Sequence, residues 1–302
     1  KRCRKEIQKA AGYVQLCAGQ KSGCKAAAKA MLELYDDPEC EMVLLVDADN
    51  AFNRVNRTVV LHNIQKTCPC LAKFLINTYW KKSKLMLPDG TCIWSKKGTT
   101  QGDPLAMIMY GLGIVPLINS LDGKNRKQVW YADDAAAGGT ISSISEWWEK
   151  LKTEGPKYGY FPNSGKTWAI VKKEHLERAK KLLDGVEIDI FSPEDFKAKI
   201  KSTKVKVTAE GHRYLEVGLG SERFREFFIN EKIKEWLKEL ERLGKIAEDH
   251  PHEAYSCLVK SLSAKWRYTM RAVGNVSGSF EKIDEKIDHD FLPKLLDREL
   301  DH

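Results

Sequence analysis

The stretch Val129–Gly138 constrains the fold of this chain more than any other, because it sets two adjacent acids between apolar residues. One apolar run leads into Asp133 and Asp134, and a second leaves them. This is the pattern of a buried hairpin with carboxylates at its tip. Carboxylates held near a core are normally paired or bound to a metal ion. An ordinary acidic turn is the competing explanation, since turns favour aspartate, so the pair needs partners elsewhere.

A second acid follows a predicted core element. Met42–Val46 is a short apolar run, which indicates a buried strand, and Asp47 comes directly after it. Asp47 and Asp133 are 86 positions apart (133 − 47), so only the tertiary fold brings them together. Adjacent strands of one sheet would do so.

Two loops complete the set of motifs. In Gly98–Leu105, Asp103 can cap a helix and Pro104 suits its first turn, while Gly102 would let a ligand approach the backbone closely. The second loop, Gly159–Lys166, is rich in turn residues and precedes a predicted strand.

The remaining periodicities predict mixed helices and strands, with a change of character near residue 221. After that point the chain reads as three amphipathic helices without chemistry-bearing motifs, and a domain boundary is expected there. The predicted helices cover 22–36, 58–66 with Thr58 as cap, 69–81, a segment from Ser145, 174–183, and about 222–244, 252–271 and 278–300; strands are expected at 84–87, 91–94, 167–171 and 214–220.

Composition narrows the class of protein. Among 302 residues, 50 Lys and Arg face 42 Asp and Glu, a net charge of +8, and residues 1–30 alone carry +7. This balance suits a polyanionic partner, although lysine runs are also common on solvated faces. The eight cysteines show no Cys-x-x-Cys spacing, and Cys68-Pro69-Cys70 has no matching second pair, which favours a reduced intracellular compartment, nuclear or cytoplasmic. No apolar run is long enough to span a membrane.

Taken together, the motifs resemble the reverse transcriptase family, over roughly residues 10–220. The likeness is nearest to enzymes of retroelements that lack long terminal repeats. The matching segments, in the family's order, are Asp47–Asn53, Gly98–Leu105, Tyr131–Asp134 and Gly159–Lys166. The resemblance implies an α+β right-hand polymerase: partial fingers and a palm with an antiparallel sheet packed on helices over 1–220, then a helical thumb-like region over 221–302.

The resemblance also implies an activity, RNA-directed DNA synthesis by two-metal nucleotidyl transfer. Two Mg²⁺ ions, with Mn²⁺ as a substitute, are the expected cofactors. RNA template, DNA or RNA primer and deoxynucleoside triphosphates are the expected partners, with no membrane. The resemblance implies that Asp47, Asp133, Asp134 and Lys166 are catalytic, and that Asp47, the Ala48 carbonyl, Asp133 and Asp134 are metal ligands.

Further residues receive roles in the same way. Phe52 would exclude a ribose 2′-hydroxyl by its bulk, and a plain core aromatic is the competing explanation. The nucleotide-binding residues are Ala48, Asp49, Asn50, Ala51, Phe52, Gln101 and Gly102; the primer or template contacts are Pro104, Tyr131, Ala132 and Leu215. The chain departs from the family at Glu216, which follows Leu215 where a glycine is usual.

Alternative hypotheses remain from the residues themselves. An RNA-directed RNA polymerase shares the same acids, and Phe52 and the Tyr131–Asp134 motif argue against it. A domesticated or degenerate nucleic-acid-binding protein without catalysis is left open by Glu216, although the intact acids argue against a loss of metal binding. A general basic scaffold would not need three placed carboxylates.

Overall fold

The computed structural model describes residues 3–100, 102–188, 201–273 and 277–297. The described residues form two compact units, one up to residue 209 and the other from residue 210 onward. Each unit is described by itself. The expected boundary at residue 221 comes after the hairpin of residues 211–220, whereas the division into units comes before it. The reason is packing, because Gly211 and Gly218 of the hairpin lie against Phe224 and Phe228 of the following helix.

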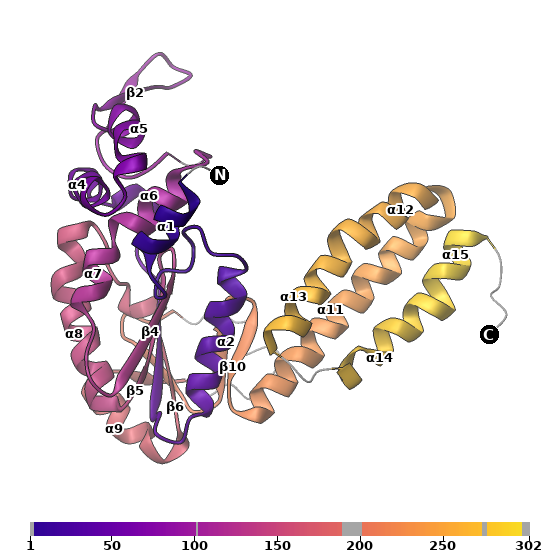
Figure 1. Cartoon of the computed structure of the whole chain (residues 1–302). Helices are drawn as coiled ribbons and strands as arrows, with labels where there is room; N and C mark the ends of the chain where they lie inside the picture. The colour runs from indigo at the N-terminus through magenta and orange to yellow at the C-terminus, as the bar shows by residue number, and fades with distance from the viewer. Residues whose placement is uncertain (1–2, 101, 189–200, 274–276, 298–302) are drawn as a thin grey trace. The chain divides into compact units, whose positions relative to one another are not determined.

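The first unit is built on a six-stranded sheet with the order β4-β5-β1-β6-β8-β7 (Figure 1). A separate two-stranded hairpin pairs β2 with β3. The strands are β1 (Met42–Val46), β2 (Ser83–Met86), β3 (Cys92–Ser95), β4 (Arg126–Tyr131), β5 (Asp134–Gly139), β6 (Trp168–Val171), β7 (Val186–Glu187) and β8 (Lys206–Thr208).

The expected antiparallel sheet is present in four strands and extended by two parallel ones. Strands β4, β5, β1 and β6 pair antiparallel, whereas β8 runs parallel to both β6 and β7. Parallel strands need a crossover connection. Helix α9 (Leu176–Leu183) lies between β6 and β7 in the chain and supplies it. The fold is therefore α+β with a mixed sheet.

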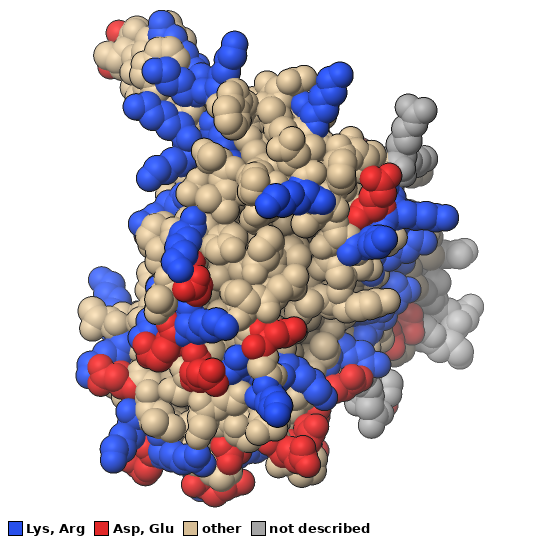
Figure 2. All heavy atoms as spheres, turned by 60° about the vertical axis from the view of Figure 1, so that its left-hand side comes forward, with Lys and Arg blue, Asp and Glu red and all other residues tan. Residues whose placement is uncertain are grey.

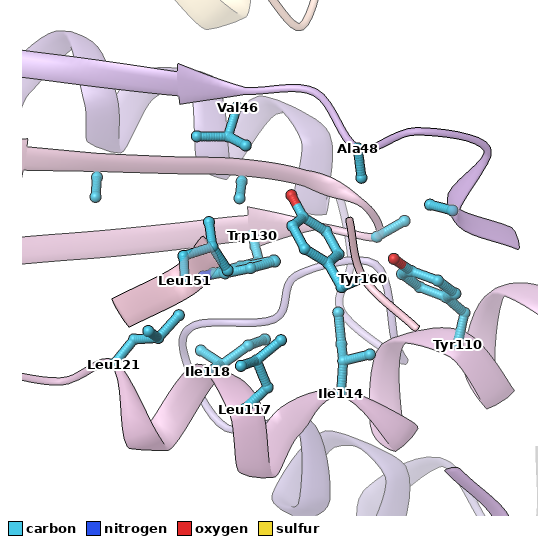
Figure 3. Packing of buried hydrophobic residues seen from close by; sticks show 14 of the residues in the cluster. Val46, Ala48, Tyr110, Ile114, Leu117, Ile118, Leu121, Trp130, Leu151 and Tyr160 are labelled. Atoms are coloured by element: carbon cyan, nitrogen blue, oxygen red, sulfur yellow. The ribbon is translucent and has the colours of Figure 1, made fainter. Parts of the chain in front are cut away.

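Helices cover the sheet, which explains why β1 is apolar at every position. All five β1 residues are buried, as expected for a strand enclosed on both faces. In Figure 3, residues of the α6–α7 segment and Leu151 of α8 pack around Trp130. Helix α2 contacts β4, β5 and β1. The helices before α9 are α1 (Arg4–Ala11), α2 (Gly23–Asp36), α3 (Ala51–Arg54), α4 (Arg57–Thr67), α5 (Pro69–Tyr79), α6 (Ala106–Gly113), α7 (Val115–Ser120) and α8 (Ile141–Tyr158).

Most predicted elements are confirmed within a few residues, and two helix starts are wrong. Helix α4 is capped by Asn56, whose side chain accepts a hydrogen bond from the Val59 amide at 3.4 Å, and not by Thr58. Asparagine is the stronger N-cap residue of the two. Helix α8 begins at Ile141 instead of Ser145, because Thr140, with its extended backbone, already acts as the N-cap residue.

The second unit is a hairpin followed by helices; the helices were expected after residue 221, whereas the hairpin was expected to belong to the first domain. Strands β9 (Gly211–Tyr214) and β10 (Val217–Gly220) precede α11 (Glu222–Asp249), α12 (Pro251–Cys257), α13 (Ser263–Val273), α14 (Ser277–Lys286) and α15 (Leu292–Leu296), with π-helical turns at Leu258–Leu262 and Ile287–Phe291. Their core includes Trp236, Leu240 and Phe280. No helix in the described ranges is long and apolar enough to cross a membrane.

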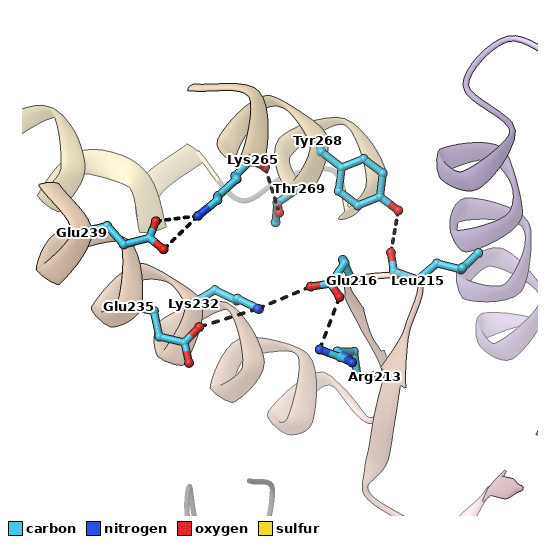
Figure 4. Close-up of polar contacts among 9 residues, drawn as sticks. All are labelled: Arg213, Leu215, Glu216, Lys232, Glu235, Glu239, Lys265, Tyr268 and Thr269. Atoms are coloured by element: carbon cyan, nitrogen blue, oxygen red, sulfur yellow. Dashed lines mark hydrogen bonds and ion pairs between the residues drawn. The ribbon is translucent and has the colours of Figure 1, made fainter. Parts of the chain in front are cut away.

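The hairpin turn of this unit holds the residue that departs from the family pattern. Leu215 and Glu216 both have positive φ, 44° and 64°, which is costly for residues with a side chain. Tyr268 donates a hydrogen bond to the Leu215 carbonyl at 2.5 Å. Glu216 pairs with Arg213 at 3.3 Å and Lys232 at 3.5 Å (Figure 4). Cations of its own unit therefore neutralise the carboxylate of Glu216.

Candidate active site

Three carboxylates meet at one edge of the large sheet. Strands β1 and β5 pair with Val46 opposite Ala135. Asp47 and Asp134 therefore occupy the next position in register, and Asp133 lies in the turn that joins β4 to β5. Directly opposed residues of antiparallel strands have Cβ atoms about 5 Å apart. The sheet thus brings together the acids that the sequence places 86 positions apart.

The turn that carries Asp133 is held by residues that the sequence did not point to. Ala132 has a φ of 57°, and the fully buried Gln15 binds it twice. The Gln15 Nε2 donates to the Ala132 carbonyl at 3.1 Å, and the Ala132 amide donates to Gln15 Oε1 at 3.0 Å. Tyr160 Oη donates to the Asp133 carbonyl at 2.9 Å. The backbone around Asp133 is therefore fixed from two sides.

The predicted Gly159–Lys166 loop closes over the end of β1. The Asn163 amide donates to the Asp47 carbonyl at 2.9 Å, and Ala48 pairs with Pro162 in an isolated bridge. Figure 3 shows Ala48 and Tyr160 on adjacent segments at this edge. Lys166 Nζ lies 3.7 Å from Asp47 Oδ2, in an ion pair half open to solvent. The loop therefore brings a cation to the acids.

A second lysine, Lys206 on β8, was missed by the sequence reasoning. It is buried, and its Nζ donates to the Gly165 carbonyl at 2.5 Å. Burial lowers its pKa, and the charge of Asp47 partly opposes that shift. The local sequence around Lys206 looks like that of the neighbouring surface lysines. Lys206 reaches the site only because β8 pairs in parallel with β6.

The surroundings of Asp133 and Asp134 disfavour the ionised form of both carboxyl groups and so raise their pKa values. Burial raises the pKa of Asp133, and Asp47 raises it further. Burial, Asp133 and Asp47 together raise the pKa of Asp134 to about 6, although the residue as a whole is exposed. Three neighbouring carboxylates that are partly shielded from solvent are stabilised either when one of them binds a proton or when they bind a cation.

This electrostatic arrangement predicts a pH dependence for the cation-free chain. The pKa of an unfolded aspartate is about 3.9, and that of folded Asp134 is about 6. Between these values the native state keeps a proton that the unfolded chain has lost, so stability should fall as pH rises from about 4 to about 6. Urea unfolding at several pH values should show this slope reduced in Asp134→Asn. An equal slope in the variant would contradict the assignment.

Phe52 lies beside the Gly98–Leu105 loop, with one face already packed. Its ring stacks on Tyr110 with centroids 4.6 Å apart and planes inclined by 24°. The Thr99 amide donates to the Phe52 carbonyl at 2.8 Å. One face of the Phe52 ring is thus packed as in a core aromatic, but the residue as a whole is only half-buried.

The loop itself is anchored by a buried arginine. Arg57 Nε donates to the Gly98 carbonyl at 2.9 Å, and one of its Nη atoms donates to the Lys97 carbonyl at 2.9 Å. Gly102 has a φ of 89°, and a Cβ built there would meet nothing within 4 Å. Gln101 lies outside the described residues. The Gly102 backbone therefore faces open space, as a residue that contacts a ligand must.

The predicted nucleotide contacts at Asp49, Asn50 and Ala51 differ in whether their backbone groups are already hydrogen-bonded within the chain. The Asp49 amide donates to the Phe161 carbonyl at 2.8 Å, so it is not available to a phosphate. The Asp49 carboxylate pairs with Arg54. Asn50 has a positive φ of 49° and turns the chain into α3, which begins at Ala51. Only Asn50 and Ala51 remain as backbone candidates in this segment.

The predicted primer and template contacts are divided between the two units. Pro104 is exposed, Tyr131 is half-buried and Ala132 is buried with both its backbone groups bound to Gln15. Leu215 belongs to the second unit. The first unit therefore offers exposed surface at Pro104 and part of Tyr131.

The donor atoms of the acidic cluster are all oxygens, contributed by Asp47, Asp133 and Asp134 and by the Ala48 carbonyl. Within the described ranges, ligand atoms of the three acids do not all lie within 4.8 Å of one another. The buried Tyr110 Oη has no hydrogen-bond partner among the described residues. Burial raises the pKa of Tyr110, and the negative charges of Asp133 and Asp134 raise it further. Oxygen donors of this kind suit Mg²⁺ or Mn²⁺.

Comparisons with known proteins place few limits on this site. No protein-family model matches the chain, and no curated protein matches it. Solved structures that match include apo telomerase from Candida tropicalis, at 11% identity and a TM-score of 0.40, covering 50% of this chain and 32% of that one. Another is telomerase from Candida albicans in complex with a TWJ fragment of telomeric RNA, at 12% identity and a TM-score of 0.47, covering 94% of this chain and 47% of that one. The chain thus spans less than half the length of either.

Proposed function

We propose that this chain is an RNA-directed DNA polymerase of a retroelement that extends a primer 3′ end by two-metal nucleotidyl transfer. One observation carries the proposal: Asp47, from the end of β1, meets the Asp133–Asp134 turn at the same sheet edge. A structural acidic turn would not need a third carboxylate from another strand.

The residues present fit a pair of divalent cations. Asp47, Asp133, Asp134 and the Ala48 carbonyl would hold them. When bound, the ions would activate the primer 3′-hydroxyl and neutralise the leaving pyrophosphate. Burial and the mutual repulsion of the acids raise the pKa values of Asp133 and Asp134, and bound cations would offset both effects.

The chain's own groups account for the rest of the chemistry. Lys166, already paired with Asp47, would stand near the phosphates and donate a proton toward pyrophosphate. Phe52 would present its free edge to the incoming sugar, because Tyr110 supports the ring from behind. Gly102 would let the nascent base pair lie against the backbone. In-line transfer needs positioning and charge neutralisation more than covalent help.

A basic and aromatic surface on the first unit supports a nucleic-acid partner. Residues 73–97 carry six lysines and a single acid, Asp89. Trp80 is 66% exposed and Trp94 is 47% exposed, and Lys82 Nζ lies 4.7 Å above the Trp94 ring. Figure 2 shows blue side chains gathered at the top of the view, where this hairpin lies. Stacking platforms beside cations are the means by which proteins bind single strands. We refer to residues 73–97 as the hairpin surface.

The hairpin surface gives a binding prediction. The double variant Trp80→Ala, Trp94→Ala should weaken binding of a primer–template with a single-stranded overhang, by about 1–3 kcal/mol for each base that loses its stack. Fluorescence anisotropy with and without the overhang would measure this. Tyr13→Ala, which removes a 95% exposed aromatic elsewhere, is the matched control. Equal losses with blunt duplex would contradict a role in single-strand binding.

The proposed function is tested by primer extension on an RNA template with Mg²⁺, in which deoxynucleotides compete with ribonucleotides. Incorporation of deoxynucleotides is the expected result. Preferential incorporation of ribonucleotides would assign an RNA-directed RNA polymerase instead. Tight primer–template binding without extension by either set would assign a nucleic-acid-binding protein.

A further inference from the structure

A cluster of sulfur and oxygen donors lies at the corner between α4 and α5, apart from the acidic site. Glu6 of α1 and Cys68 and Cys70 at the corner each offer one ligand atom, and these atoms all lie within 4.8 Å of one another. The two sulfurs are 3.6 Å apart. In the part of the chain that the structure describes, no other trio of His, Cys, Asp or Glu meets this criterion. Glu6 and Cys68 are 62 positions apart (68 − 6), so the fold assembles the group.

The local structure explains how the corner presents two sulfurs. The Cys68 amide closes α4 by donating to the Ile64 carbonyl at 2.8 Å, and Pro69 then starts α5. Cys70 therefore stands in the first turn of α5. Cys68 is fully buried, whereas Cys70 and Glu6 are exposed. A ligand would thus meet an inner sulfur that is already fixed and two outer groups that are open to solvent.

A further sulfur stands beside this trio, although it does not lie within 4.8 Å of all three of the other ligand atoms. Cys3 precedes α1, packs against the same core cluster as Cys68, and its side chain lies within hydrogen-bond reach of Cys70. The Ile7 amide donates to the Cys3 carbonyl at 2.9 Å, so Cys3 already belongs to the first turn. Cys3 and Glu6 are three positions apart and therefore share one side of the helix.

We propose that Glu6, Cys68 and Cys70 bind one Zn²⁺ ion as a structural site, which Cys3 completes by moving toward the ion from its place beside Cys70. Soft thiolates select zinc over the hard cations that the all-oxygen site would take. Sulfurs at about 2.3 Å from a tetrahedral ion are about 3.8 Å apart, close to the observed 3.6 Å. Four protein donors leave no open coordination position, which is typical of structural and not catalytic zinc.

The site would join the N-terminal helix to the body of the first unit. Helix α1 leads into the segment of Gln15, which holds the Ala132 turn beside Asp133. A zinc link between α1 and the α4–α5 corner closes a loop of about sixty residues and so restricts the unfolded chain. This role is independent of the proposed polymerase activity, since zinc would not touch the acidic cluster.

The test is metal binding by the reduced, chelator-treated full chain. One equivalent of Zn²⁺ should bind and raise the unfolding temperature, and Co²⁺ in its place should give a thiolate-to-metal charge-transfer absorption. Cys70→Ser should weaken binding by about 100-fold or more and lose part of that absorption. Cys92→Ser, an exposed cysteine on β3, is the matched control and should change neither.

Three results would overturn the proposal. They are the absence of the charge-transfer absorption in the wild-type chain, an equal loss of affinity in Cys92→Ser and Cys70→Ser, and a disulfide among Cys3, Cys68 and Cys70 in the chain isolated without reductant. The cobalt spectrum of the wild-type chain decides the matter even if a cysteine variant fails to fold. Because the assay contains no primer or nucleotide, its outcome does not depend on polymerase activity.

Discussion

Asp133→Asn should abolish primer extension, lowering the rate by about 10³-fold or more, while primer–template binding and the fold remain intact. The substitution keeps the shape of the side chain and removes one of the charges needed to hold divalent cations at the sheet edge. Stability should not fall, because burial and Asp47 already disfavour the charged form of Asp133, as its raised pKa indicates. Extension kinetics, duplex binding and urea unfolding of the same preparation would separate these effects.

The control for this variant is Asp284→Asn. Asp284 is exposed on α14 of the second unit and carries the same change of charge away from the site. It should extend primers at the wild-type rate. Extension by Asp133→Asn within a few-fold of the control would remove Asp133 from the site, and loss of duplex binding together with extension would point to misfolding.

Gln15→Leu should be the most damaging single change to the architecture of the site. The side chain is fully buried, and its amide satisfies both backbone groups of Ala132. Leucine fills nearly the same volume but leaves a buried N–H and a buried C=O without partners. Each such group costs about 1–3 kcal/mol, so a loss of about 2–6 kcal/mol in the free energy of unfolding is expected. Denaturant unfolding would measure it.

Activity should fall further in Gln15→Leu than the loss of stability explains. Ala132 holds a left-handed backbone conformation that an unsupported alanine adopts only at a cost. Without Gln15 the turn would relax and Asp133 would shift from Asp47. Extension assayed well below the unfolding temperature should therefore drop, whereas Gln65→Leu, at an exposed position, should leave both quantities unchanged. A stable and active Gln15→Leu would show that the turn holds its shape unaided.

Several elements of the fold follow from local sequence patterns. The five apolar residues before Asp47 predict β1, and the pair Asp133–Asp134 between apolar runs predicts the β4–β5 hairpin, both of which are present. The amphipathic helices after residue 221 are present as well. These patterns are readable because side-chain periodicity and turn chemistry act within a few residues.

Other features depend on pairings that no local pattern encodes. Gln15 supports the Ala132 turn from 117 positions away, and Lys206 approaches Asp47 only because β8 runs parallel to β6. In the sequence, Cys68-Pro69-Cys70 lacks a second pair of ligands. The fold supplies neighbours from α1 instead.

By itself, the sequence determined most of the strands, hairpins and helices, though not β7 and β8, and which carboxylates stand at strand ends. The tertiary structure alone decided which of these groups meet, since contacts between distant segments depend on strand order and register. The same register sets the pKa of Asp134, because a carboxylate's ionisation depends on the charges and burial that the fold brings to it. Burial of a polar side chain such as Gln15 is likewise a property of the assembled core, and the identity of a single residue does not reveal it.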